Sequence, residues 1–154
     1  MSANNQLYEA DTAAWADFNA DRFWQRRFAD IDIENLIEKL EDIGKSERRF
    51  LESHLVVLLM HLLKWQYQSR LRCNRRKLSI ANARQSISDA LEDSPSLKPR
   101  FVDAAFIERA YSKARRLAAN KTGFDVLIFP EQCSYAADQL LADCLPFRPN
   151  PFLI

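Results

Sequence analysis

The amino-acid sequence predicts an all-α protein whose helices pack as an up-and-down antiparallel bundle of four main helices plus a short C-terminal helix. The first 94 residues contain no proline, so nothing there breaks a long helix. The 154 residues include two glycines, too few for a set of tight hairpins or for phosphate-binding loops. Apolar residues recur at spacings of three and four, which is the period of an amphipathic helix.

The first two helices cover the N-terminal half of the chain. The first is expected over about 7–28, with a candidate break at Asn19-Ala20-Asp21. Asp32 is placed to cap the second helix, because an N-cap carboxylate accepts a hydrogen bond from a first-turn amide. Gly44 either ends this helix or weakens it by about 1 kcal/mol relative to alanine, and we favour one long helix that is straight or kinked at this position.

An apolar stripe runs along the second helix and is expected to face the other helices. Its members are Ile33, Leu36, Ile37, Leu40, Ile43, Phe50, Leu51, His54, Leu55, Leu58, Leu62 and Trp65. Nearly every position of 55–63 is apolar, which is typical of a helix at the centre of a bundle. We therefore expect Leu55, Leu58, Leu62 and Trp65 to form the core.

The third and fourth helices are expected over about 71–92 and 96–122. The inward positions of the third are Leu78, Ile80, Ala83, Ile87, Ala90 and Leu91. Ser96 is the expected cap of the fourth helix, and Gly123 is suited to end it in a left-handed conformation.

The C-terminal part is expected to be less regular. The apolar stretch 124–131 has no second strand to pair with, so we expect a loop packed across the bundle. Ser134 is the expected cap of the last helix. The length fits one domain, so we expect a single helical domain over 1–154 with extended tails at 1–6 and 146–154.

The cysteines and the apolar stretches predict a cytoplasmic protein with no membrane partner. Cys73, Cys133 and Cys144 have no zinc-binding spacing, and their odd number is typical of a reducing compartment. The polar N-terminus lacks the features of a signal peptide. The longest apolar stretch, 55–63, is far shorter than the ~20 residues of a membrane span.

Four segments carry a family resemblance. The central segment 34–68 ends in HLLKWQYQ, and 91–101 reads LEDSPSLKPRF. The segments LYEADTAAW (7–15) and TGFDVLIFPEQCSYAADQLL (122–141) fit the same pattern. The chain thus resembles the bacterial family catalogued as domain of unknown function number twenty-nine. The resemblance implies a single-domain helical protein and brings no activity, cofactor or catalytic residue with it.

The two histidines are the candidate metal ligands. His54 and His61 are seven residues apart, so they share a helix face but lie about 10.5 Å apart along the axis. One ion cannot bind both. Each is either a hydrogen-bonded residue of a helix interface or a metal ligand or general base completed by a carboxylate from another helix.

The charges are strongly segregated along the chain. Residues 1–44 contain 4 basic and 10 acidic side chains, and residues 45–121 contain 17 basic and 7 acidic ones. The densest basic segment is Arg70, Arg72, Arg75, Arg76 and Lys77, which follows Trp65 and Tyr67. Arginines next to aromatic residues suit nucleic acid. The sequence pI of about 7.7 is low for a nucleic-acid-binding domain, so we favour docking of this segment on the acidic first third, within the chain or across a dimer.

These observations favour a non-enzymatic helical interaction module that binds a protein partner or itself. No convergent set of catalytic residues is present, and we expect no cofactor. The first alternative is an accessory protein that binds nucleic acid through 70–77. The second is a bundle that binds a metal or small molecule through His54 or His61.

Overall fold

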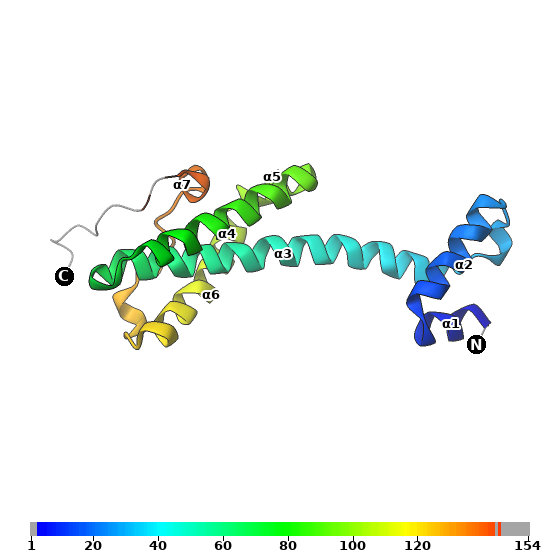
Figure 1. Ribbon diagram of the computed structural model, residues 1–154, viewed down its shortest axis with the longest axis horizontal. Helices are drawn as coiled ribbons and strands as arrows, with labels where there is room; N and C mark the ends of the chain where they lie inside the picture. Colours follow the sequence, from blue (N-terminus) through cyan, green and yellow to red (C-terminus); the bar gives the residue numbers. More distant parts are fainter. Residues whose placement is uncertain (1–2, 144, 146–154) are drawn as a thin grey trace. The chain divides into compact units, whose positions relative to one another are not determined.

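The computed structural model describes residues 3–143 and 145, and it confirms the all-α prediction, since these residues include helices and loops but no strand (Figure 1). The α-helices are α1 (Ala3–Ala10), α2 (Thr12–Trp24), α3 (Ile33–Tyr67), α4 (Asn74–Asp93), α5 (Lys98–Phe101), α6 (Ala104–Thr122) and α7 (Ala137–Leu141). The 3₁₀ helices are η1 (Phe28–Asp30), η2 (Ser69–Leu71), η3 (Pro95–Leu97) and η4 (Val126–Ile128). Cys144 and the expected tail 146–154 lie outside the described residues.

Contacts between residues divide the chain into two compact units. Unit 1 is Met1–Ser46, and unit 2 is Glu47–Ile154. Helix α3 contributes its first part to unit 1 and the rest to unit 2. Gly44 lies inside α3, so the expected long helix continues through this glycine.

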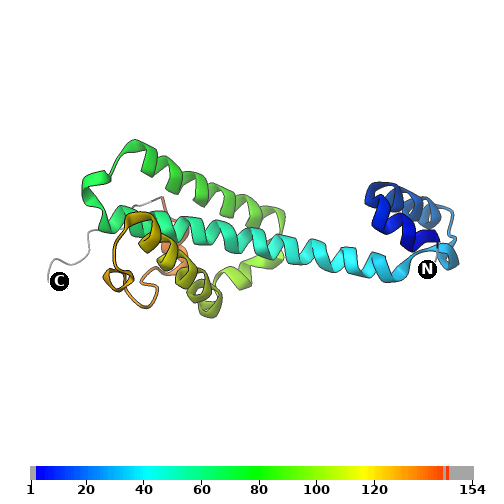
Figure 2. The same cartoon turned by 90° about the horizontal axis from the view of Figure 1, so that it is seen from below.

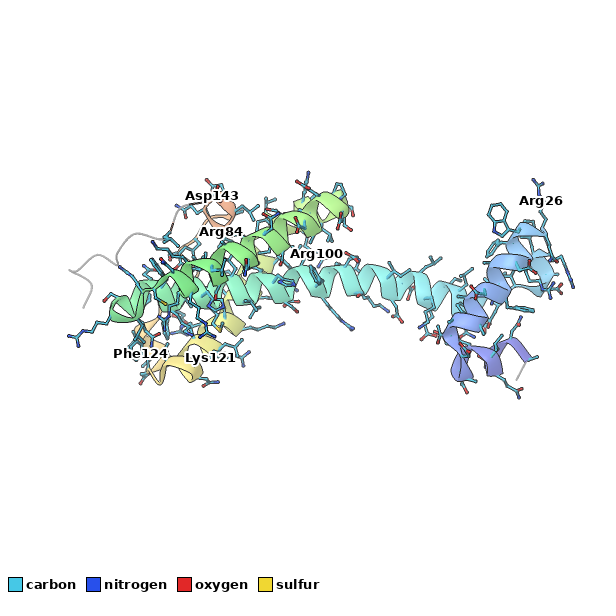
Figure 3. All side chains as sticks on the ribbon, viewed as in Figure 1. Arg26, Arg84, Arg100, Lys121, Phe124 and Asp143 are labelled. Atoms are coloured by element: carbon cyan, nitrogen blue, oxygen red, sulfur yellow. The ribbon has the colours of Figure 1, made fainter. Side chains whose placement is uncertain are left out.

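The helices of unit 1 begin and end at other residues than expected. The expected N-terminal tail is wrong for residues 3–6, which belong to α1. The break in the first helix lies at Asp11 and not at Asn19, because the Asp11 carboxylate accepts from the Ala14 amide at 3.0 Å and starts α2 there. After α2 the chain turns at Arg26, whose φ of +58° is left-handed (Figure 3).

The interior of unit 1 is a network of polar groups around one aromatic residue. Trp15 is 3% exposed, and its Nε1 donates to the Asp32 carboxylate at 3.0 Å. Asn19, also buried, donates to the Trp15 carbonyl at 2.9 Å and accepts from the Asp32 amide at 2.9 Å. Asp32 also accepts from the Asn35 side chain at 2.8 Å and from its amide at 3.4 Å, so it caps α3 as predicted. Among the described residues of unit 1, Trp15 is the one fully buried apolar side chain, and polar groups surround it.

The apolar stripe of α3 is buried only from Leu51 onward, which corrects the expectation for its first part. Ile33, Ile37, Leu40 and Ile43 are 58%, 52%, 62% and 61% exposed. Phe50 is 48% exposed, and the buried core of the protein includes α3 residues only from position 51 on. The reason is that α4 and α6 pack against 51–65, whereas unit 1 directs polar side chains inward.

The core of unit 2 lies between α3, α4 and α6. Leu55, Leu58, Leu62 and Trp65 are 0%, 0%, 1% and 7% exposed. Helix α4 runs back alongside the second half of α3 in both views (Figures 1 and 2). Helix α6 adds the other main buried side chains, which are Phe106, Ile107, Ala110, Tyr111, Ala114, Ala118 and Ala119. We predicted that Leu78 of α4 faces the core, and this prediction is wrong, because the side chain is 59% exposed.

The boundaries of the later helices are set by capping residues. Asp103 caps α6 through a hydrogen bond from the Ala105 amide at 3.3 Å, so Ser96 is not the cap that we expected. Pro95 and Pro99 instead lie in the short helices η3 and α5. Gly123 ends α6 with a φ of +74°, as predicted.

The segment 124–131 is a loop with one 3₁₀ turn, as expected, and its Phe129 is 1% exposed. The Tyr111 hydroxyl donates to the Pro130 carbonyl at 2.7 Å, and Arg115 Nε donates to the Phe129 carbonyl at 3.1 Å. Helix α7 begins after Ala136 and not after Ser134. Among the described residues, no helix is long and apolar enough to cross a membrane.

Candidate functional site

The two predicted metal ligands have different neighbours on α3. The ring of His54 lies 4.2 Å from the ring of Phe50, centre to centre, so this imidazole packs on an aromatic face. His61 is half-buried and has cations around it. Within the described part of the chain, no group of three or more histidine, cysteine or acidic side chains could hold a metal ion.

His61 is part of a group of cations from three helices. Burial lowers the pKa of His61, and the charges of Lys64, Arg76 and Lys121 lower it further. Burial also lowers the pKa of Lys64, and Arg76 and Lys121 act in the same direction. We call His61, Lys64, Arg76 and Lys121 the basic cluster. It joins α3, α4 and the C-terminal end of α6, where Lys121 and Phe124 lie (Figure 3).

Two of the five predicted nucleic-acid-binding residues are bonded to the end of α3. Arg72 Nε donates to the Trp65 carbonyl at 2.8 Å. Arg76 Nη1 donates to the Lys64 carbonyl at 3.4 Å, and its Nη2 donates to the Gln68 side chain at 2.8 Å. The last carbonyls of a helix lack partners within the helix and carry a partial negative charge. Arg72 and Arg76 therefore stabilise the C-terminus of α3.

Trp65, one of the two aromatic residues beside the basic segment, is not available for stacking on bases. Trp65 is 7% exposed, and the Arg72 guanidinium lies 5.4 Å from its ring centre. Lys77 Nζ lies 6.0 Å from the same ring. Arg70, Arg75 and Lys77 are exposed, so these three remain on the surface from the predicted set.

Sequence reasoning missed a buried cation on α4. Arg84 is 8% exposed and donates to the carbonyls of Leu140 at 2.9 Å and Gln139 at 3.4 Å, which attaches α7 to α4. Arg84 also lines an open hollow of about 340 Å³ with Lys77 and Asp143. Arg84 and Asp143 lie on the side of unit 2 where α7 packs (Figure 3).

The thiol of Cys133 has no features of a nucleophile. It is half-buried near Tyr135, and burial raises its pKa to about 11. A thiol with a raised pKa remains protonated at neutral pH, and the thiolate is the reactive form.

A second surface feature lies on unit 1. The first turns of α3 carry five apolar residues at helical spacing: Ile33, Leu36, Ile37, Leu40 and Ile43. We call them the α3 stripe, because they lie on one side of the helix. Glu34 and Glu41 follow one edge of the stripe and are exposed. The helical spacing of these apolar residues was visible in the sequence, but spacing alone does not distinguish a face in the core from a face that docks on a partner.

The fold and these surfaces define a small all-helical protein with separated acidic and basic parts. The family model described as domain of unknown function DUF29 matches residues 7–145. The chain belongs to this family, which confirms the resemblance that the four sequence segments indicated. No curated protein and no solved structure matches the chain.

Proposed function

We propose that the protein is a non-enzymatic interaction module that binds a protein partner or a second copy of itself. The observation that carries the proposal is the α3 stripe, in which Ile33, Ile37, Leu40 and Ile43 are exposed. Soluble proteins carry single apolar residues on their surface, but a contiguous apolar patch with a polar rim is typical of an interaction site. Burying such surface contributes about 25 cal/mol per Å², which favours a bound state.

The same proposal includes the finer arrangement of the fold. This arrangement is an up-and-down antiparallel bundle of four main helices within a single domain. The antiparallel course of α3 and α4 in unit 2 supports this arrangement. A bacterial and cytoplasmic setting is also part of the proposal, and the free thiols of Cys73 and Cys133 support it.

Site-specific photo-crosslinking in the source cells tests the proposal. A photoreactive phenylalanine derivative replaces Leu40 in the stripe, and the same residue at Asp42, on the side of α3 away from the stripe, is the matched control. Both positions are exposed. We expect a discrete protein adduct from position 40 and none from position 42. Equal labelling at both positions, or none at position 40, would contradict an interaction through this face.

The basic cluster and the exposed Arg70, Arg75 and Lys77 favour nucleic acid as the second candidate. The charges of Arg76 and Lys121 add to burial in lowering the pKa of His61 and of Lys64, and a bound phosphate would supply the opposite charge. Fluorescence anisotropy with a labelled single-stranded RNA at rising salt tests this function.

If phosphates are bound, affinity falls steeply with salt, by a slope of about 0.7 per contact on single strands. Replacing Arg70, Arg75 and Lys77 by glutamine should flatten that slope. Arg100→Gln, at the end of α5 (Figure 3), is the matched control. Binding that does not change with salt would rule out this candidate.

A further inference from the structure

Unit 1 leaves most of its large apolar side chains in solvent. Within residues 3–46 the buried core contains one hydrophobic residue, Trp15. The same unit exposes Phe23, Trp24, Phe28, Ile33, Ile37, Leu40 and Ile43, at 45–88% of their full accessibility. A helical unit of this size needs a larger apolar core, or another covering surface, to be stable.

The exposed apolar area of unit 1 is comparable to one side of a protein–protein interface, and the α3 stripe supplies about half of this area. A fully exposed large side chain presents about 200 Å², so these seven residues expose roughly 800 Å². A standard protein–protein interface covers ~800 Å² on each partner. The seven residues lie in two groups, the α3 stripe and the end of unit 1's second helix, where the Phe23 and Phe28 rings are 6.2 Å apart. The α3 stripe has the regular spacing that a helical partner surface requires.

Charge indicates which surface covers the stripe. Unit 1 contains 5 basic and 10 acidic side chains, a net charge of −5. Unit 2 contains 17 basic and 11 acidic side chains, a net charge of +6. Two copies of unit 1 therefore repel each other. A unit 2 from another molecule carries the complementary charge, which favours its approach to unit 1.

Unit 2 carries two exposed leucines with basic neighbours, one in η2 and one in the first part of α4. Leu71 and Leu78 are 55% and 59% exposed, and Arg70 and Arg75 beside them in the sequence are exposed. Arg75 and Leu78 are three residues apart on α4, so they lie on one face of the helix. We call Arg70, Leu71, Arg75 and Leu78 the α4 patch. Its pattern of apolar residues beside cations matches the apolar α3 stripe beside Glu34 and Glu41.

We propose that the α3 stripe of one molecule docks on the α4 patch of a second copy of this chain. A closed dimer makes this contact twice, once in each direction, with the two contacts equivalent by symmetry. The inference rests on the proposed function and specifies its partner. Each contact places leucine and isoleucine side chains on Leu71 and Leu78, with Glu34 and Glu41 near Arg70 and Arg75.

Sedimentation equilibrium of the full chain over a range of protein concentrations tests the dimer. We expect a monomer–dimer equilibrium that weakens with salt, because surface charge pairs are screened. Leu40→Glu should raise the dissociation constant by at least about tenfold, and Asp42→Asn, on the side of the helix away from the stripe, should leave it unchanged. Since both residues are exposed, neither change removes a core side chain. Circular dichroism should verify equal helix content.

Charge exchange between two chains tests whether the α3 stripe and the α4 patch contact each other. Glu41→Arg and Arg75→Glu should each weaken the homodimer. A mixture of the two variants should form a heterodimer, since one contact then pairs two wild-type faces and the other pairs two reversed charges. Native mass spectrometry of the mixture identifies this species.

A chain that is monomeric at every concentration would overturn the proposal, as would a dimer that Leu40→Glu leaves unchanged. If the chain is monomeric and position 40 still crosslinks to a different protein, the interaction module survives and self-docking is refuted. If position 40 yields no adduct and the chain is monomeric, both fail.

Discussion

Asp32 gives the sharpest test of the structure of unit 1. Its carboxylate accepts hydrogen bonds from the Trp15 indole and from Asn35, and it caps α3. Asp32→Ala removes the cap, at about 0.5–2 kcal/mol, and leaves the buried indole N–H without this acceptor, at about 1–3 kcal/mol. Together these losses are about 1.5–5 kcal/mol. A unit of this size has a stability of only about 2–7 kcal/mol, so we expect unit 1 to open locally.

Hydrogen exchange read by mass spectrometry measures this opening directly, because peptides from 12–24 report on α2. We expect Asp32→Ala to remove most of the free energy of local opening that protects the amides of α2 from exchange. Asp32→Asn retains an acceptor for the Trp15 indole and a good N-cap, so it should lose less than half as much. Asp17→Ala, an exposed position on α2, is the control and should change the free energy by less than about 0.5 kcal/mol. The reasoning is refuted if the alanine variant retains full protection or if asparagine is as damaging as alanine.

The pKa of Asp32 predicts that the stability of unit 1 depends on pH. Burial raises the pKa of Asp32, but the hydrogen bonds from Asn35 and Trp15 outweigh it, so the pKa lies below its ordinary value. A carboxyl group with a lowered folded-state pKa stabilises the fold above its unfolded-state pKa of about 3.9. This stabilisation should be lost as the pH falls from that value through the lower folded-state pKa, and Asp32→Asn should abolish this part of the pH dependence.

Three further predictions concern unit 2. Leu62→Ala should cost about 2–5 kcal/mol in a urea melt, whereas Val57→Ala, 39% exposed, should cost less than about 0.5 kcal/mol; equal costs would contradict the position of the core. Tyr111→Phe should lower the free energy of unfolding by about 1–2 kcal/mol, because a loop carbonyl loses its donor; no change would show that water replaces the hydroxyl. NMR titration should give a His61 pKa below about 6.5, and this pKa should rise in Lys121→Gln. The neutral imidazole should stabilise the fold above about pH 6.5, and this stabilisation should be lost as the pH falls through the lower folded-state pKa. A His61 pKa that is the same in Lys121→Gln would exclude Lys121 from the basic cluster.

The helices of this protein were predictable because their signals are local. Asp32 and Gly123 mark helix ends through the chemistry of a single residue, a short acceptor in one case and a left-handed backbone in the other. The absence of proline before position 95 correctly predicted the uninterrupted α3. The loop at 124–131 followed from an apolar segment without a pairing strand.

The exposure of apolar side chains and the hydrogen-bond partners of the arginines could not be predicted from local sequence in the same way. The spacing of Leu40 and Leu62 is alike, but only Leu62 has α4 and α6 beside it. The roles of Arg72 and Arg76 depend on the turn at η2, which brings the start of α4 back to the last carbonyls of α3. Lys121 acts on the pKa of His61 although it lies sixty residues later in the chain, and no local sequence pattern predicts that the two are close.

The loop that follows α6 has a consequence for how the chain folds. Phe129 and Pro130 accept hydrogen bonds from Arg115 and Tyr111, which lie 14 and 19 residues earlier, so these contacts close only short lengths of chain. By contrast, Arg84 reaches α7 across 56 residues. Short closures cost less entropy and form sooner. We therefore expect α6 and its loop to form one early local structure during synthesis, with α7 docking last, and a chain shortened after position 131 should retain Phe129 in its buried place.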